Sequence, residues 1–201
     1  RQYLATLPNF IVMAASDEAE LVRMINTSTE INDRPCAFRY PRGTGIGSIL
    51  PSINEKIEIG KSRIIQEGKK LALINFGARL SQTLKASENL KKKGINITLV
   101  DARFAKPLDE NLIWQLATTH EAIVTIEEGS IGGFGSHVID FLSKKGLMDT
   151  NLKFRSMKLP DIFIDQDKPE NMYKLANLDS ISIEEQILDV LNSNIILQKQ
   201  K

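Results

Sequence analysis

From residue 61 onward, short apolar segments alternate with segments whose apolar residues recur at helical spacing. The expected strands lie at 63–66, 71–76, 95–100, 121–126 and 154–159, the first two joined by a turn at Glu67–Gly68. The expected helices lie at 78–93, 108–119 and 136–146, near 169–176 and from about 183. Short apolar strands separated by helices are typical of a parallel sheet with helices on both faces. The pattern therefore predicts a three-layer α/β domain with a mostly parallel sheet over 61–201.

The first 48 residues predict an α/β segment of their own. An apolar strand at 10–15 ends at Ser16, a residue type that favours the N-cap of a helix, and acidic residues follow where the helix dipole favours them. A second strand is expected at 36–40. Residues 49–60 belong to a stretch rich in glycine and proline without a sustained period, and they are expected to form a linker. Near the other end, Ser182 and Glu185 predict a capping box for the last helix.

Composition argues against several classes of partner. Lysine and arginine number 26 against 25 aspartate and glutamate, so the net charge of +1 gives no general reason to expect nucleic acid or an anionic membrane. No apolar run approaches the roughly 18 residues of a membrane span.

The one cysteine, Cys36, cannot form an intramolecular disulfide, and it is expected to be a small buried apolar residue. The expected location is the cytoplasm. The chain begins at Arg1, close to a core strand, which favours a fragment of a longer protein.

Residues 39–43, Arg-Tyr-Pro-Arg-Gly, form the first candidate site. Pro41 lacks a backbone donor and ends the strand, so Arg42 is expected at the carboxyl end of that strand, where open α/β sheets bind ligands. A guanidinium can donate two parallel hydrogen bonds to a phosphate or carboxylate. A surface arginine paired with a neighbouring acid fits the pattern equally well.

Residues 129–136 form a glycine-rich loop that follows a strand and opens a helix. Such a loop can hold a phosphate at a helix N-terminus, but the glycine spacing is neither the dinucleotide fingerprint nor a P-loop. A tight strand-to-helix turn is the favoured interpretation. Glu127 and Glu128 precede the loop and are expected on opposite faces of the strand end, exposed to solvent.

Other polar residues predict structure rather than chemistry. Asp101 and Arg103 lie in one turn and are expected to hold it by an ion pair. His120 and His137 lack metal-ligand spacing to another histidine or cysteine, so no metal site is expected. The basic run Lys91–Lys93 is interpreted as a polar helix end.

Several stretches, taken in order, resemble one enzyme family. Residues 11–20 and 38–43 resemble the end of the pyrimidine-binding domain of the 1-deoxy-D-xylulose-5-phosphate synthases. Residues 101–109, and 125–129 with the glycine loop, resemble the C-terminal domain of transketolase-like enzymes. Residues 159–164 are closer to the synthases than to transketolase. Each motif alone is weak, but the ordered set covers essentially the whole chain.

The resemblance implies a fold and a reaction. The chain would be the C-terminal portion of a synthase: the tail of a pyrimidine-binding domain over 1–48, a linker over 49–60 and a transketolase C-terminal domain over 61–201. The family condenses pyruvate with glyceraldehyde 3-phosphate, with loss of carbon dioxide, to give 1-deoxy-D-xylulose 5-phosphate. This product feeds isoprenoid precursors, thiamine and pyridoxal phosphate. Thiamine diphosphate stabilises the carbanion left by decarboxylation, and magnesium anchors its diphosphate.

The resemblance also implies roles for single residues. Arg42 matches the arginine that binds the phosphate of the acceptor, and Arg39 and Tyr40 neighbour that site. The main cofactor-binding residues of the family lie in regions that this chain lacks, so the chain alone is expected to be inactive. The full-length family members are homodimers, and surfaces that meet the missing regions are expected to be exposed and apolar.

Two other readings stay open. The first is another thiamine-diphosphate enzyme, either transketolase or the β subunit of a 2-oxo acid dehydrogenase, since both share the C-terminal architecture. The second is a non-catalytic assembly or regulatory module with this fold. The fold alone does not separate these readings, because function depends on sites.

Overall fold

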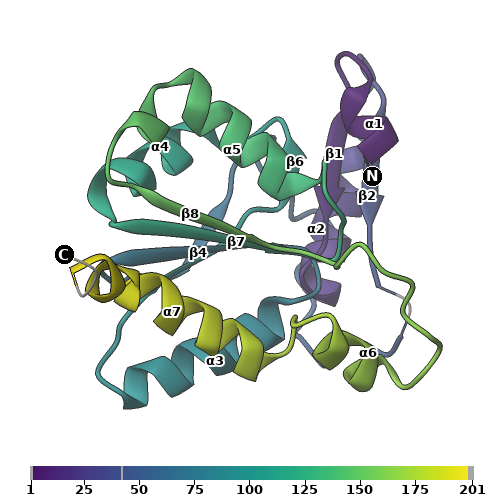
Figure 1. The fold of residues 1–201 in the computed structure, drawn as a ribbon. Helices are drawn as coiled ribbons and strands as arrows, with labels where there is room; N and C mark the ends of the chain where they lie inside the picture. The colour runs from purple at the N-terminus through teal and green to yellow at the C-terminus, as the bar shows by residue number, and fades with distance from the viewer. Residues whose placement is uncertain (1, 42, 199–201) are drawn as a thin grey trace.

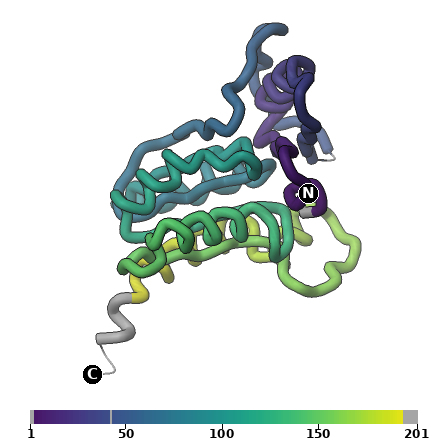
Figure 2. Tube along the Cα trace, turned by 90° about the horizontal axis from the view of Figure 1, so that it is seen from above, coloured from purple at the N-terminus to yellow at the C-terminus, as the bar shows by residue number. Residues whose placement is uncertain are grey.

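The larger part of the chain forms a five-stranded sheet. The computed structural model describes residues 2–41 and 43–198, with side chains over 3–41 and 43–193 (Figures 1 and 2). The strand order is β3-β5-β4-β7-β8, in which only β3 is antiparallel to its neighbour. The strands are β3 (Arg63–Gln66), β4 (Leu71–Phe76), β5 (Thr98–Asp101), β7 (Ala122–Glu127) and β8 (Lys153–Met157). The predicted mostly parallel sheet is confirmed.

Helices cover both faces of this sheet, which confirms the predicted three layers (Figure 1). Successive residues of β4 point to opposite faces, and all six are buried. One face packs against α4 (Glu110–Thr119) and α5 (Phe134–Lys144). The other packs against α3 (Leu80–Lys92) and α7 (Ser180–Gln198). A parallel strand buried on both faces is expected to be mostly apolar, and in β4 only Asn75 is polar.

A second, three-stranded sheet stands beside the first, at the right of Figure 1. Its order is β2-β1-β6, with β1 (Ile11–Ala14) parallel to β2 (Cys36–Arg39) and antiparallel to β6 (Phe104–Lys106). Two helices belong to this part, α1 (Gln2–Thr6) and α2 (Glu18–Ser28). The sequence analysis did not anticipate β6, which lies between β5 and α4 in the chain and yet completes the sheet of the first segment.

Val12 and Ala14 of β1 share one apolar core with the α4–α5 face of the large sheet. The segment between the two sheets is also held in place. The carboxylate of Glu18 in α2 accepts hydrogen bonds from the backbone N–H groups of Gly47 and Ser48 at 2.5 and 2.9 Å. The two sheets therefore share a core, and hydrogen bonds tie the segment after β2 to α2.

Strands β3 and β4 are consecutive in the chain, but β5 lies between them in the sheet. Two local predictions are wrong. Ser16 does not cap α2; Asp17 does, accepting from the N–H of Glu20 at 2.7 Å. The last helix begins at Ser180, and the carboxylate of Asp179 accepts from Ser182, which lies inside the first turn. In both cases an aspartate supplies the cap in place of the predicted serine, since both residue types favour that position. Asp17 follows Ser16 directly, and Asp179 lies three residues before Ser182.

The short helix predicted near 169–176 is present as α6 (Pro169–Leu175), which precedes α7. A 3₁₀ turn that was not predicted, η1 (Leu147–Asp149), precedes β8. The basic run ends α3, where the helix dipole favours cations, and Lys93 pairs with Glu184 of α7 at 2.6 Å. A search of the described helices for one with the length and apolarity of a membrane span finds none.

Candidate functional site

Arg39 ends β2 and reaches across to the large sheet. Its Nη1 donates to the backbone carbonyl of Glu128 at 3.0 Å, and its Nη2 lies 3.4 Å from the Glu128 carboxylate. Glu128 directly follows β7, so the carboxyl ends of β2 and β7 meet here. Ligands bind at the carboxyl ends of parallel strands in open α/β sheets.

Two further side chains contact the same carboxylate. The hydroxyl of Tyr173 in α6 donates to Glu128 Oε1 at 2.6 Å, and Arg79 Nε lies 3.0 Å from the same oxygen. The second contact is an ion pair in which the N–H is not aimed at the oxygen. The guanidinium of Arg79 stacks on the ring of Tyr173 at 3.4 Å. Burial, helped by the bond to Glu128, raises the pKa of Tyr173. We call Arg39, Arg79, Glu128 and Tyr173 the arginine cluster.

The arginine cluster has more positive than negative charge. It combines two guanidinium groups with one carboxylate, and the side chain of Arg39 stays 40 % exposed. Such an arrangement favours a phosphate or carboxylate ligand, since guanidinium groups bind planar anions in a bidentate manner. Tyr40 is exposed, and together with Pro41 it lines a narrow recess against Gly77 and Glu128. Arg42 lies outside the described residues, so its predicted phosphate contact stays a prediction.

The sequence analysis missed Arg79 and Tyr173. Arg79 follows β4 after Gly77, which adopts a left-handed conformation at φ 90°. A glycine and an arginine directly after a buried strand were a usable signal for a ligand site. Tyr173 gave no such signal, because it comes from a short helix far along the chain.

The glycine-rich loop wraps around Glu127. This carboxylate is buried, not exposed as the sequence analysis expected, and it accepts from the N–H of Gly135 at 3.0 Å. A Cβ atom on Gly129 or Gly133 would lie 2.2 or 2.3 Å from a Glu127 oxygen. Burial raises the pKa of Glu127. The first turn of α5 thus donates to a carboxylate of the chain itself, which favours the tight-turn interpretation.

A cavity of about 390 Å³ lies beside the arginine cluster and shares Arg39 and Glu128 with it. Phe76 and Phe134, stacked with ring centroids 4.9 Å apart, form part of its wall. His137 also lines it, and burial lowers the pKa of this imidazole. Within residues 2–41 and 43–198, no group of histidine, cysteine, aspartate and glutamate has the arrangement of a metal site.

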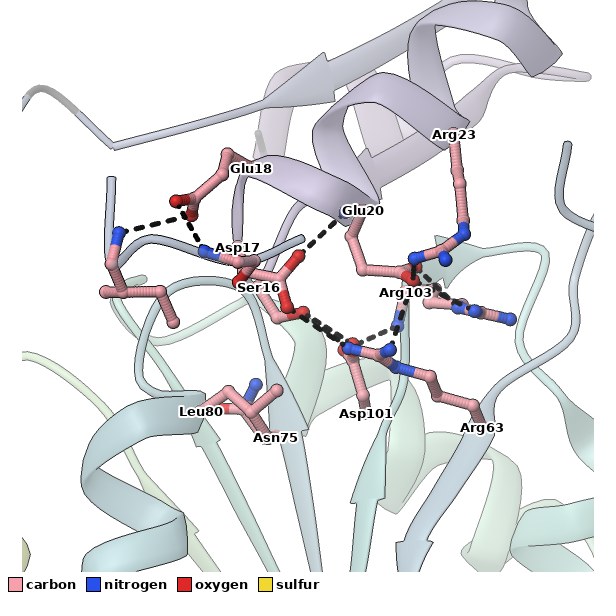
Figure 3. A network of polar contacts seen from close by, with 12 residues as sticks. Ser16, Asp17, Glu18, Glu20, Arg23, Arg63, Asn75, Leu80, Asp101 and Arg103 are labelled. Carbon is pink, nitrogen blue, oxygen red and sulfur yellow. Dashed lines mark hydrogen bonds and ion pairs between the residues drawn. The ribbon is translucent and has the colours of Figure 1, made fainter. Parts of the chain in front are cut away.

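A second polar contact between the two sheets is buried (Figure 3). The carboxylate of Glu20 lies 2.7 Å from Arg103 Nε and 3.3 Å from Arg63 Nη1, and its side chain is fully buried. Asp101, at the end of β5, accepts from Ser16 Oγ at 2.6 Å and lies 3.2 Å from Arg63 Nε. We call this group the closed junction. Its members are Ser16, Asp17, Glu20, Arg63, Asp101 and Arg103.

The closed junction corrects one prediction. Asp101 and Arg103 do not form a side-chain ion pair across their turn; each pairs with a residue from another element. Arg103 has a left-handed backbone, φ 57°, which turns its guanidinium toward α2. Burial raises the pKa of Asp101 to about 6, against the opposing effects of Ser16 and Arg63. The fold therefore uses this turn to join its two sheets.

Comparison with known proteins identifies the large sheet and its helices. Residues 60–183 match the family model described as transketolase, C-terminal domain. This chain belongs to the transketolase C-terminal domain family. The match begins three residues before β3 and ends in the first turn of α7, so it covers the whole five-stranded sheet.

Two solved structures share the fold of this transketolase family member beyond the matched region. One is a split gene transketolase, described as an inactive β4 tetramer, with a TM-score of 0.81 and 24% identity over 95% of this chain. The other is the transketolase of Campylobacter jejuni subsp. jejuni NCTC 11168, with a TM-score of 0.64 and 14% identity over 93%. This chain spans 61% and 27% of the lengths of those two chains. Both similarities include the three-stranded sheet, since they cover nearly the whole chain.

Proposed function

We propose that this chain is the C-terminal part of a 1-deoxy-D-xylulose-5-phosphate synthase and that it binds the phosphate of the acceptor aldehyde. The observation behind this proposal is the arginine cluster at the carboxyl end of β2, where the Tyr-Pro-Arg-Gly motif begins. Membership in the transketolase C-terminal domain family supports the enzyme class. The ordered motifs of the sequence support the synthase within that class.

The proposed reaction joins pyruvate to glyceraldehyde 3-phosphate. The bond between the keto carbon and the carboxylate of pyruvate breaks, and carbon dioxide leaves. The keto carbon then bonds to the aldehyde carbon, whose oxygen takes up one proton. Arg42 would hold the phosphate of the aldehyde through charge-assisted hydrogen bonds, beside Arg39 and Tyr40. Fixing the phosphate orients the aldehyde for bond formation.

Thiamine diphosphate would supply the carbanion chemistry in the whole enzyme. We assign neither the diphosphate nor its magnesium ion to the described residues, among which no group of three or more histidine, cysteine, aspartate and glutamate side chains could hold a metal ion. No step through the cofactor is therefore assigned to this chain. We propose that the residues for both groups lie in other regions of a homodimeric synthase.

The chain alone is proposed to be inactive. Large apolar side chains stand exposed along the segment between the two sheets, as expected for a surface that meets other parts of an enzyme. They are Ile46, Ile49, Leu50 and Ile53. One similar structure is described as a split gene transketolase and as inactive. That description is compatible with a chain that is inactive without the other parts of its enzyme. The cytoplasm stays the proposed location.

The test uses the full-length synthase, wild type beside Arg42→Ala. Each protein receives pyruvate, glyceraldehyde 3-phosphate, thiamine diphosphate and magnesium, and product is followed by mass spectrometry. The wild type is expected to form 1-deoxy-D-xylulose 5-phosphate. The variant is expected to show a KM for the aldehyde that is roughly 10- to 100-fold higher, the cost of losing a hydrogen bond to a charged group.

Other products would point to the alternatives. A wild type that transfers ketol groups between sugar phosphates is a transketolase, and one that transfers an acyl group to lipoamide belongs with the 2-oxo acid dehydrogenases. A protein that binds cofactor and forms none of these products contradicts the proposal and favours a non-catalytic module.

A further inference from the structure

Glu128 is the central residue of the arginine cluster. Its Oε1 contacts Tyr173 at 2.6 Å and Arg79 at 3.0 Å, while its Oε2 lies 3.4 Å from Arg39. Its backbone carbonyl accepts a second bond from Arg39 at 3.0 Å. The Glu128 side chain is only 6 % exposed. One buried residue therefore fixes the Arg39 guanidinium through both its main chain and its side chain.

Arg39 is the point from which the candidate phosphate-binding segment leaves the sheet. The carbonyl of Arg39 accepts from the N–H of Ala15 at 2.9 Å, which is where the ladder of β2 ends. Pro41 has no N–H group to extend that ladder. The guanidinium of Arg39 is therefore held by Glu128 at the point where the strand ends.

We propose that Glu128 is a positioning residue that sets the selectivity for a phosphorylated acceptor, an inference that rests on the proposed function. Glu128 fixes the guanidinium of Arg39, one of the candidate phosphate-binding groups. Arg79 and Tyr173 keep the Glu128 carboxylate in place from the side of the large sheet. Glu128 touches no substrate in this scheme; it acts through Arg39.

A second effect opposes the first, so their sizes decide the outcome. Loss of the negative charge would by itself remove a repulsion and raise the affinity for a nearby phosphate about several-fold at a partly exposed site. Displacement of a binding group by about 1 Å costs up to roughly 100-fold. Positioning therefore outweighs charge, and loss of Glu128 should weaken recognition of the phosphate.

The experiment compares two acceptors in the full-length synthase. The kcat/KM for D-glyceraldehyde 3-phosphate is divided by that for D-glyceraldehyde, which lacks the phosphate. Glu128→Gln keeps the size of the side chain and removes its charge. The variant is expected to lower this ratio about tenfold through a higher KM for the phosphorylated aldehyde, with kcat for either acceptor changed less than about threefold. A purely structural role would affect both acceptors alike.

Two further variants complete the design. Glu184→Gln is the matched control, since it breaks a comparable ion pair with Lys93 on the α3–α7 face, and it should leave the ratio unchanged. Tyr173→Phe keeps every charge and removes one donor to Glu128, and it should lower the ratio about threefold. If circular dichroism shows that Glu128→Gln does not fold, Tyr173→Phe still tests the positioning role of Glu128.

The outcomes separate the two proposals. A wild type without product from either aldehyde overturns the proposed function and this inference with it. An active wild type with the same ratio in Glu128→Gln and Tyr173→Phe overturns this inference alone. A higher ratio in Glu128→Gln also overturns it, because Glu128 would then act only as a repelling charge.

Discussion

The closed junction and the arginine cluster join the same two sheets with the same kinds of residue, but they differ in burial and in charge. In the closed junction, Glu20 and Asp101 are almost fully buried and acidic groups outnumber the arginines. In the arginine cluster, two arginines share one carboxylate, and Arg39 is open to solvent. Each acidic side chain of the closed junction contacts an arginine, and Glu20 also contacts Arg23 from outside it, whereas the cluster has positive charge available to a ligand. The first arrangement is suited to stability and the second to binding.

The largest expected loss of stability follows from a change in the closed junction. Glu20→Gln removes the one carboxylate that contacts Arg23, Arg63 and Arg103. Removing one partner of a buried ion pair costs about 3–5 kcal/mol. The low end is expected here, because Arg103 loses its carboxylate partner while the other two arginines each keep a second one. Urea unfolding should show a loss of this size, and Glu55→Gln, whose partly exposed side chain also pairs with Arg23, should cost less than about 1 kcal/mol. Equal losses in the two variants would remove the contrast between buried and exposed pairs.

The second effect is the dependence of stability on pH that arises from Asp101. The folded state raises the pKa of Asp101 from 3.8 to about 6, so it holds the proton more tightly than the unfolded chain does. Stability from this group is thus present at low pH and is lost as the pH rises through this window. Asp101→Asn cannot ionise, and its Oδ1 can still accept from Ser16 and Arg63. Between pH 4 and pH 7 the wild type should lose about 2 kcal/mol relative to this variant.

The measurement for Asp101 is urea unfolding of both proteins at several pH values. The difference between them cancels groups that do not interact with Asp101. Glu20 has the opposite sign, because its arginine partners lower its pKa despite its burial, and its charge contributes to the raised pKa of Asp101. A difference that does not change with pH would mean that Asp101 titrates normally in the closed junction.

The smallest effect on stability is expected in the arginine cluster. Arg39→Ala removes an ion pair whose guanidinium is 40 % exposed, and such pairs contribute up to about 1 kcal/mol. Thermal unfolding should therefore show a change at the edge of detection, while selectivity for the phosphorylated aldehyde falls. A stability loss as large as that of Glu20→Gln would show that the two junctions are alike.

The sequence by itself determined the layers. Strands β4 and β7 are apolar at every position apart from Asn75, Thr125 and the final Glu127, and helices follow each of them, so a parallel sheet with two covered faces was predictable. The end of β2 was also predictable, because Pro41 cannot continue a strand. These features depend on local periodicity and on the chemistry of single residues.

Only the tertiary structure decided which distant residues meet. Arg39 and Glu128 are 89 positions apart, Arg103 and Glu20 are 83 apart, and β6 joins a sheet whose other strands come from the start of the chain. The sequence placed Glu127 and Glu128 at an exposed strand end, yet both are buried beneath the neighbouring sheet and loop. Local periodicity cannot set the order of strands, because that order follows from how whole layers pack. The same packing determines which residues pair with each buried charge.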